Sequence, residues 1–255
     1  MKTIGFHIQK GGVGKTTCAV NTAAELALAH GKVLIVDADP QGNTTSWMVT
    51  EGIESDLCDV FQGKVPLAEA IKKVRDNLWI LPTFAIGGEL RAWTDVNLAN
   101  KPKAITASVI GKAQELGFDF VIFDMSPGMA TLERMLVRNC DEVVGIVKAE
   151  YFSFDGIETY EAEIKKLRED FDAEFIAEKL VLNQVNKGFG IHNAYAEKLA
   201  TTKYELFSIG QSTKVAEAQV HHQTLREFDP KNKANEEFAK VATALLSKQR
   251  SLLGV

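Results

Sequence analysis

The chain has 255 residues, of which 45% are hydrophobic and 25% charged, and its formal net charge is −5. This composition is ordinary for a soluble globular protein and supplies enough apolar residues for the core of one α/β domain. No apolar run approaches the roughly 20 residues that a membrane-spanning helix needs. Cys18, Cys58 and Cys140 are isolated and odd in number, which argues against a disulfide framework or a metal site and predicts reduced packing residues in a cytoplasmic protein.

Short apolar runs alternate along the chain with longer segments of helical periodicity. Continuous apolar runs are typical of strands that are buried on both faces, and they occur at residues 4–8, 33–36, 78–81, 120–123, 143–147 and 180–182. Helical spacing of apolar residues occurs at 19–29, 101–116, 131–139 and 157–168. The alternation predicts an α/β fold with a doubly wound, mostly parallel sheet and helices on both faces. Because no linker divides the chain, we expect one domain over residues 1–255.

The first predicted strand is followed directly by a glycine-rich octet and then by the predicted helix. Glycines let backbone N–H groups turn towards an anion, and the helix presents the positive end of its dipole. Lys15 is placed to contact the β- and γ-phosphates of a nucleotide, and the Thr16 hydroxyl is placed to ligate Mg²⁺. The sequence therefore predicts a binding site for a nucleoside triphosphate. The residues of the octet are Lys10, Gly11, Gly12, Val13, Gly14, Lys15, Thr16 and Thr17.

The octet differs from the ordinary phosphate loop at its beginning. The ordinary pattern has a glycine at position 9, whereas this chain has Gln9 there and a second lysine, Lys10, directly after it. A lysine at this place adds nothing to core packing and is repelled by Lys15. One interpretation is a solvated surface lysine. The stronger interpretation is a second cation directed at the transferring phosphate.

Two carboxylates, Asp37 and Asp39, follow the apolar run at 33–36 and precede Pro40. Alternate positions place both on the same side of an extended chain. Beside a phosphate loop, such a carboxylate can hold the water shell of Mg²⁺ or orient an attacking water. A simple polar turn is the alternative. With the phosphate loop present we predict a functional cluster, with Asp37 at the metal site.

A third cluster begins where the apolar run at 120–123 ends in Asp124. An acid at the end of a buried strand matches the residue that supports Mg²⁺ through water in phosphoryl-transfer sites. The following Ser126-Pro127-Gly128 segment is a predicted switch loop that senses the γ-phosphate. Many strands end in aspartate, so this signal gains its value from the two preceding clusters.

The octet resembles the deviant phosphate loop of the ParA/MinD family of ATPases, and the resemblance extends over nearly the whole chain. DADPQGN at 37–43 resembles the second nucleotide motif of this family. IVKAEYFSFDGI at 146–157 is similar to the segment after its fifth strand, and LVLNQVNKG at 180–188 to its adenine-contacting segment. Residues 215–242 resemble the region that helps to cover the base and leads into a final helix.

The resemblance implies roles for individual residues. Lys10 is expected to reach the nucleotide of the partner subunit, and Asp39 is expected to support hydrolysis together with Lys10 and Lys15. Asn183 falls at the place of the adenine contact, with a capping or turn residue as the alternative. Glu150 falls at the place of a ribose contact.

The resemblance also implies an activity, which is slow, partner-stimulated hydrolysis of ATP with Mg²⁺ as cofactor. We expect a homodimer on ATP binding, nonspecific DNA binding, and segregation or positioning of plasmid, chromosome or other cargo. The expected partners are a ParB-like stimulating protein or a cargo adaptor. The expected location is the cytoplasm, in association with the nucleoid.

The DNA-binding expectation meets a departure from the family pattern. Gln211 and Lys214 stand where the family often has arginines, and lysine offers a point charge without bidentate geometry. Residues 179–255 nevertheless carry 11 Lys and Arg against 7 Asp and Glu. This excess predicts either a basic face for DNA or an ordinary solvated surface. Candidate residues for that face are Lys187, Lys203, Lys214, His221, His222 and Arg226.

Three other functions on the same phosphate loop remain to be weighed. A MinD-like protein would use an amphipathic C-terminal helix on a membrane surface, but we expect the helix at 234–252 to pack on the core and expect no stable membrane association. A small-molecule synthetase would need a substrate pocket, for which no residue cluster is evident. An iron–sulfur protein would need paired cysteines at the dimer axis, and Cys140 alone does not supply them.

Overall fold

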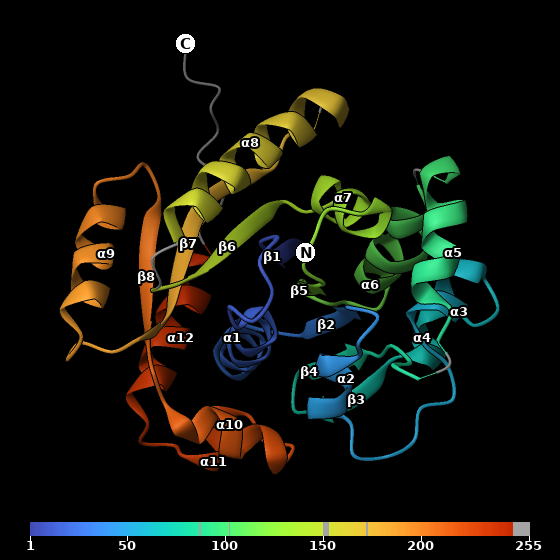
Figure 1. The fold of residues 1–255 in the computed structure, drawn as a ribbon. Helices are drawn as coiled ribbons and strands as arrows, with labels where there is room; N and C mark the ends of the chain where they lie inside the picture. Colours follow the sequence, from blue (N-terminus) through green and yellow to red (C-terminus); the bar gives the residue numbers. More distant parts are fainter. Residues whose placement is uncertain (87, 102, 150–152, 172, 247–255) are drawn as a thin grey trace.

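The computed structural model describes residues 1–255 except 87, 102, 150–152, 172 and 247–255. The described residues form an eight-stranded sheet in the order β3-β4-β2-β5-β1-β6-β7-β8 (Figure 1). Neighbouring strands are parallel except β3 and β4, so the predicted mostly parallel sheet is confirmed. The strands are β1 Lys2–His7, β2 Val33–Ala38, β3 Lys72–Arg75, β4 Leu78–Leu81, β5 Phe120–Met125, β6 Glu142–Lys148, β7 Ile176–Val185 and β8 Glu205–Gly210.

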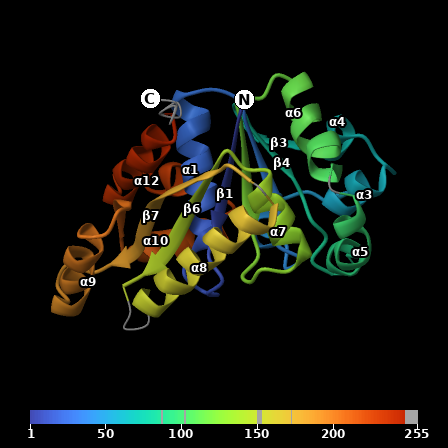
Figure 2. The same cartoon turned by 90° about the horizontal axis from the view of Figure 1, so that it is seen from above.

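Helices connect the strands and cover both faces of the sheet (Figure 2). Helices α1 and α12 pack together on one face, and α7 and α8 lie on the other. The predicted doubly wound architecture is therefore confirmed. The helices are α1 Lys15–Ala29, α2 Asn43–Met48, α3 Leu57–Gln62, α4 Leu67–Ala70, α5 Leu90–Asn97, η1 Leu98–Asn100, η2 Thr106–Ile110, α6 Gly111–Glu115, α7 Thr131–Arg138, α8 Ser153–Phe171, α9 Gly190–Ala200, α10 Thr213–Val220, α11 Leu225–Phe228 and α12 Lys233–Ala244.

All six predicted strands occur, and the sheet has two further strands at its edges. Strands β3 and β8 are only partly buried, and their sequences, KKVR and ELFSIG, contain polar residues. An edge strand needs no continuous apolar run, because solvent reaches one side of it. The pattern that revealed the inner strands was therefore weak in these two.

Within the described residues, the C-terminal helix packs on the rest of the domain. Helix α12 begins at Lys233, and Phe238, Val241 and Leu245 are buried at 0%, 1% and 0% exposure. Its neighbours are α1 and β8. The remainder of the predicted helix, residues 247–252, lies outside the described residues. None of the described helices has the length and apolar character that crossing a membrane requires.

Candidate phosphate-binding site

The glycine-rich loop joins the end of β1 to the first residue of α1, as the sequence predicts. Gly12 and Gly14 have positive φ angles of 72° and 93°, a region that glycine enters without steric cost. A Cβ atom on Gly14 would lie 2.1 Å from Nδ2 of Asn183, so any other residue there would also have to displace the Asn183 side chain. The loop therefore places backbone N–H groups at the positive end of the α1 dipole.

Lys15 begins α1 and is buried at 7% exposure. Its Nζ atom donates to the backbone carbonyl of Lys10 at 3.2 Å. Burial lowers the pKa of Lys15, and the charges of Asp124, Asp39 and Glu133 oppose this shift. Three carboxylates from three different segments are thus within electrostatic reach of one buried ammonium group. A phosphate at this place would meet a cation that is already held in position.

Asp37 and Asp124 meet across the sheet at the C-terminal ends of β2 and β5. Oδ2 of Asp37 accepts hydrogen bonds from the backbone N–H and the hydroxyl of Thr45, both at 2.7 Å. Oδ2 of Asp124 accepts from the Thr44 hydroxyl at 2.6 Å. Sequence reasoning missed both threonines, although they follow the acidic cluster within a few residues. They fix the orientation of the two carboxylates.

Burial dominates the ionisation of these two acids. Burial and the charge of Asp124 raise the pKa of Asp37 to about 8, and burial raises that of Asp124 to about 6. The Oδ1 atom of Asp124 is buried and has no hydrogen-bond partner among the described residues. Such an atom suits a ligand that brings its own donors, for example a metal-bound water.

The residues present fit a magnesium ion that is held partly by a nucleotide. Among the described residues no group of three or more His, Cys, Asp or Glu could hold a metal by itself. Mg²⁺ commonly takes one or two protein ligands and completes its shell with phosphates and water. Thr16 would hold it directly, and Asp37 and Asp124 would contact its water shell.

Asp39 lies next to this pair, directly after β2, and is buried at 7% exposure. Its Oδ1 accepts from the backbone N–H of Gln41 at 2.9 Å, and its own N–H donates to Oδ1 of Asp37 at 3.3 Å. The segment therefore forms the polar turn that is the alternative interpretation, and the functional role of Asp39 stays a prediction. The turn holds a carboxylate within the electrostatic reach of Lys15.

Asn183 contacts the phosphate loop from β7. Its Nδ2 atom donates to the Val13 carbonyl at 2.8 Å, and its side chain is buried at 2% exposure. It also borders a cavity of about 160 Å³ beside α1, whose lining includes Thr17, Ser212 and Phe238. The predicted adenine contact stays a prediction, because the structure contains no nucleotide. The observed role is support of the loop.

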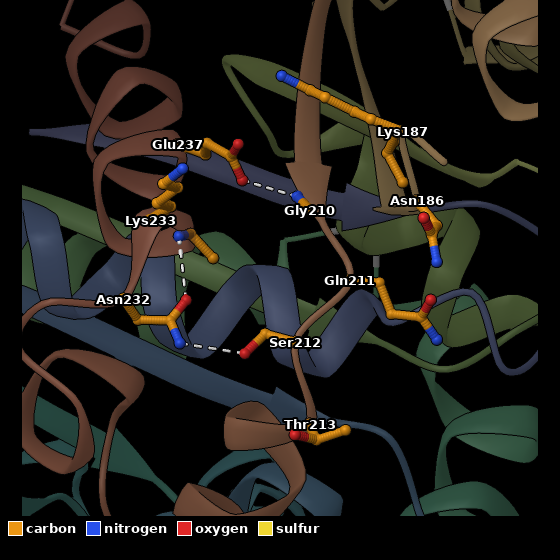
Figure 3. A pocket seen from close by; sticks show the side chains of 11 residues that line it. Asn186, Lys187, Gly210, Gln211, Ser212, Thr213, Asn232, Lys233 and Glu237 are labelled. Atoms are coloured by element: carbon orange, nitrogen blue, oxygen red, sulfur yellow. Dashed lines mark hydrogen bonds between the residues drawn. The ribbon is translucent and has the colours of Figure 1, made fainter. Parts of the chain in front are cut away.

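A larger hollow of about 730 Å³ lies beyond that cavity, between the ends of β7 and β8 and the start of α12 (Figure 3). Glu237 accepts the backbone N–H of Gly210 at 2.6 Å, and Asn232 donates to the Ser212 hydroxyl at 3.1 Å. These two bonds fix the chain between β8 and α10. Lys187 extends along the opposite wall.

Several residues of the predicted basic face have acidic neighbours. Nζ of Lys203 lies 3.0 Å from Glu161, and Nζ of Lys214 lies 2.7 Å from Glu217. These pairs are largely exposed, so each contributes little to stability. They nevertheless reduce the positive field that a DNA phosphate would experience at Lys203 and Lys214.

Arg226 and His222 are also engaged within the chain. The guanidinium of Arg226 makes two 2.9 Å contacts with the carboxylate of Glu25 and one of 3.3 Å with Glu236. Nδ1 of His222 lies 3.2 Å from the backbone carbonyl of Trp47. Both side chains thus fasten the segment before α12 to the rest of the domain.

Comparison with known proteins identifies the family. A family model described as an AAA domain matches residues 1–177. The sporulation initiation inhibitor protein Soj of Bacillus subtilis is 26% identical over 94% of this chain and 96% of its own length. The chain belongs to the ParA/Soj family of P-loop ATPases. The resemblance that the octet indicated is therefore confirmed.

Solved structures extend the ParA/Soj assignment at the level of the fold. An ATP complex of Cyanothece McdA superposes with a TM-score of 0.82 at 21% identity, covering 98% of each chain. Cobyrinic acid a,c-diamide synthase from Mycobacterium smegmatis, with bound ADP and magnesium, has a TM-score of 0.79 at 20% identity over 96% of this chain and 94% of its own. These likenesses confirm the P-loop fold that this ParA/Soj-like chain shares with enzymes of other classes.

Two predicted site residues need separate mention. Lys10 is exposed at the beginning of the loop, and its backbone carbonyl contacts Lys15. Its expected contact with a nucleotide of a second subunit stays a prediction, because the structure contains one chain. Glu150, the expected ribose contact, lies outside the described residues.

Proposed function

We propose that this chain binds ATP with Mg²⁺, dimerises around it and hydrolyses it slowly. The observation that carries the proposal is the buried Lys15 ammonium beneath the glycine loop, with Asp39 and Asp124 close enough to act on it. A phosphate site, a metal-supporting acid and a hydrolytic acid are thus gathered at the ends of β1, β2 and β5. The ATP complex of McdA and the ADP–magnesium complex of the synthase support the choice of ligands.

The chemistry follows from the positions of these groups. Lys15 and the backbone N–H groups of the loop bind the β- and γ-phosphates and neutralise charge on them. Asp39 orients the attacking water in line with the γ-phosphate. Asp37 and Asp124 would hold the water shell of Mg²⁺, and the ion would supply positive charge that offsets the charge of the phosphates.

Dimerisation assigns Lys10 its role. Lys10 is exposed at the edge of the loop, so a second subunit that docks there would bring its own Lys10 to the nucleotide of the first. ATP favours the closed dimer because Lys15 and the Lys10 of the second subunit contact the γ-phosphate, which ADP lacks. Hydrolysis therefore removes the preference for the dimer. Stimulation of ATP hydrolysis by a partner protein makes the cycle of ATP binding, dimerisation and hydrolysis run in one direction.

Nonspecific DNA binding by the dimer is the less supported part of the proposal. Lys203 and Lys214 pair with acidic neighbours, and Gln211 stands at a position where the family often has an arginine. We therefore expect weak binding with a small dependence on salt concentration, since few phosphates would be neutralised. Cargo positioning through a ParB-like protein or an adaptor completes the proposed cycle.

One experiment tests the core of this function. The size of the purified chain is measured by light scattering with ADP and with ATP, in Mg²⁺, with and without nonspecific duplex DNA. A dimer with ATP and a monomer with ADP are expected. A monomer in both states would overturn the proposal, and DNA-dependent mass in the ATP sample alone would support DNA binding.

Two alternatives on the same fold are distinguished by other measurements, namely ATP hydrolysis with a small substrate and sedimentation with lipid vesicles. A synthetase, for which the likeness to the cobyrinic acid enzyme is the motive, would hydrolyse ATP only when its small substrate is supplied. A MinD-like protein would sediment with anionic lipid vesicles when loaded with ATP. The buried apolar face of α12 favours the DNA-linked cycle over the membrane-linked one.

A further inference from the structure

Glu133 is a buried carboxylate that neither core packing nor the proposed cycle explains. It is the third residue of α7 and has 0% exposure. Arg91 of α5 donates to both of its oxygens, at 3.0 and 3.2 Å. The Ser126 hydroxyl contacts Glu133 as well, and Arg91 also donates to Ser126 Oγ at 3.0 Å. Arg91, 42 positions earlier in the chain, and Ser126, seven positions earlier, thus converge on the charge of Glu133.

This cluster lies at the phosphate loop. Ser126 belongs to the predicted switch loop, and Pro127 of that loop approaches Gly11, whose Cβ would lie 3.9 Å from Pro127 Cγ. The charge of Glu133 also acts on Lys15, for which it raises the pKa against the stronger lowering by burial. The pair therefore stands beside the place where the γ-phosphate would meet Lys15.

Arg91 is also linked electrostatically to this site. Burial lowers the pKa of Arg91, but the hydrogen bond and charge of Glu133, with smaller effects of Asp95 and Asp39, raise it overall. Arg91 is thus within electrostatic reach of Asp39, the predicted hydrolytic acid. Glu133 is buried but the Arg91 side chain is 37% exposed, and such an ion pair is a poor way to gain stability, because desolvation of the buried carboxylate offsets much of the attraction. The location of the Arg91–Glu133 pair beside the phosphate site explains the pair better than a contribution to stability does.

We propose that the Arg91–Glu133 pair sets the preference of the site for a nucleoside triphosphate over a diphosphate. The proposal rests on the proposed function, since it concerns the same nucleotide. ATP differs from ADP by a negatively charged phosphate beside Lys15, so Glu133 disfavours ATP and Arg91 favours it. Their balance, held by the contact with Ser126, determines how readily the γ-phosphate enters.

Two substitutions break the same ion pair but change the charge in opposite directions. Glu133→Gln removes a negative charge and keeps the shape, whereas Arg91→Met removes a positive charge and keeps most of the stem. The ratio of the dissociation constants of ADP and ATP is measured by calorimetry in saturating Mg²⁺. We expect this ratio to rise about three- to tenfold in Glu133→Gln and to fall by a similar factor in Arg91→Met, as unit charges several ångströms away require. The double variant should return close to the unmodified chain.

A merely structural contact predicts a different result. Loss of the ion pair would then shift the ratio in the same direction in both variants, or leave it unchanged, and either outcome overturns the inference. Arg91→Lys, which keeps the charge, should retain a ratio close to that of the unmodified chain. The matched control is Arg134→Ala. Arg134 is next to Glu133 in the chain and forms an exposed ion pair with Asp170 at 2.8 Å, and loss of this pair should leave the ratio unchanged.

Failure of the proposed function is distinguishable from failure of this inference. A chain that binds neither nucleotide contradicts the proposed function and the inference together. A chain that binds both, with a ratio insensitive to the two charges, contradicts the inference alone. If Arg91→Met does not fold, the Glu133→Gln variant is compared with the double variant. These two differ only in the charge of Arg91, so the fall in the ratio on removing that charge is still measured.

Discussion

Asp37 and Asp124 lie directly opposite each other on the adjacent parallel strands β2 and β5. Each is held by a hydroxyl of α2, Thr45 for Asp37 and Thr44 for Asp124. This juxtaposition is unfavourable even with Lys15 nearby, because burial and mutual repulsion both oppose two negative charges. The raised pKa values of both acids express that cost. A site with this property is built to receive positive charge.

The stability of the nucleotide-free chain should therefore depend on pH. The pKa of Asp37 is raised to about 8, so the folded chain binds more protons than the unfolded chain between about pH 4 and 8, and the free energy of unfolding falls as pH rises. Buried His7, with its pKa lowered to about 3, acts in the opposite direction below about pH 6.5. The window of about pH 6.5 to 8 avoids the effect of His7, and within it Asp37 acts together with Glu163, whose pKa burial raises to about 7. Urea unfolding should show the fall there, and a smaller fall in Asp37→Asn. An equal slope in both proteins would contradict this assignment.

Lys15→Ala should abolish nucleotide binding. It removes the buried cation of the loop and leaves Asp39 and Asp124 without its charge. Loss of one partner in a buried charged contact costs about 2–5 kcal/mol, a weakening of ~30-fold or more. Calorimetric titration with ATP measures it. Lys112→Ala, which removes an exposed lysine paired with Glu115, serves as the control and should bind normally.

Asp39→Asn should bind ATP but hydrolyse it about 100-fold more slowly, the order of magnitude of a lost water-orienting acid. Asparagine keeps an oxygen for the N–H of Gln41, so the turn after β2 persists. Asp39→Ala loses both the turn contact and the acid. Phosphate release and light scattering should show a trapped ATP dimer in both variants. A monomeric Asp39→Ala chain with ATP would contradict the model.

Asn183→Ala separates two roles of that residue. Its observed hydrogen bond supports the Val13 carbonyl, and loss of this bond should cost about 1 kcal/mol of stability and weaken ATP and GTP binding equally. An adenine contact would instead weaken ATP binding more than GTP binding. The ratio of the two affinities, measured by competition with a fluorescent nucleotide, decides between support and base recognition.

The sequence alone determined the elements that depend on local order. A glycine loop between an apolar run and a helical segment predicts a phosphate site because the loop, the strand end and the helix end are contiguous in the chain. The same is true of Asp37 and Asp124, each at the end of its own buried strand. The inner strands carried a continuous apolar pattern, so the class of fold followed from them as well.

Tertiary structure decided which distant residues meet. Thr44 reaches Asp124 across 80 positions, and Arg91 reaches Glu133 across 42, so no window of sequence contains either pair. The edge strands β3 and β8 were also invisible, because partial exposure leaves polar residues in them. Periodicity reports only the average environment of a segment, whereas the partner of a buried charge is chosen by the packing of the elements that carry the two groups.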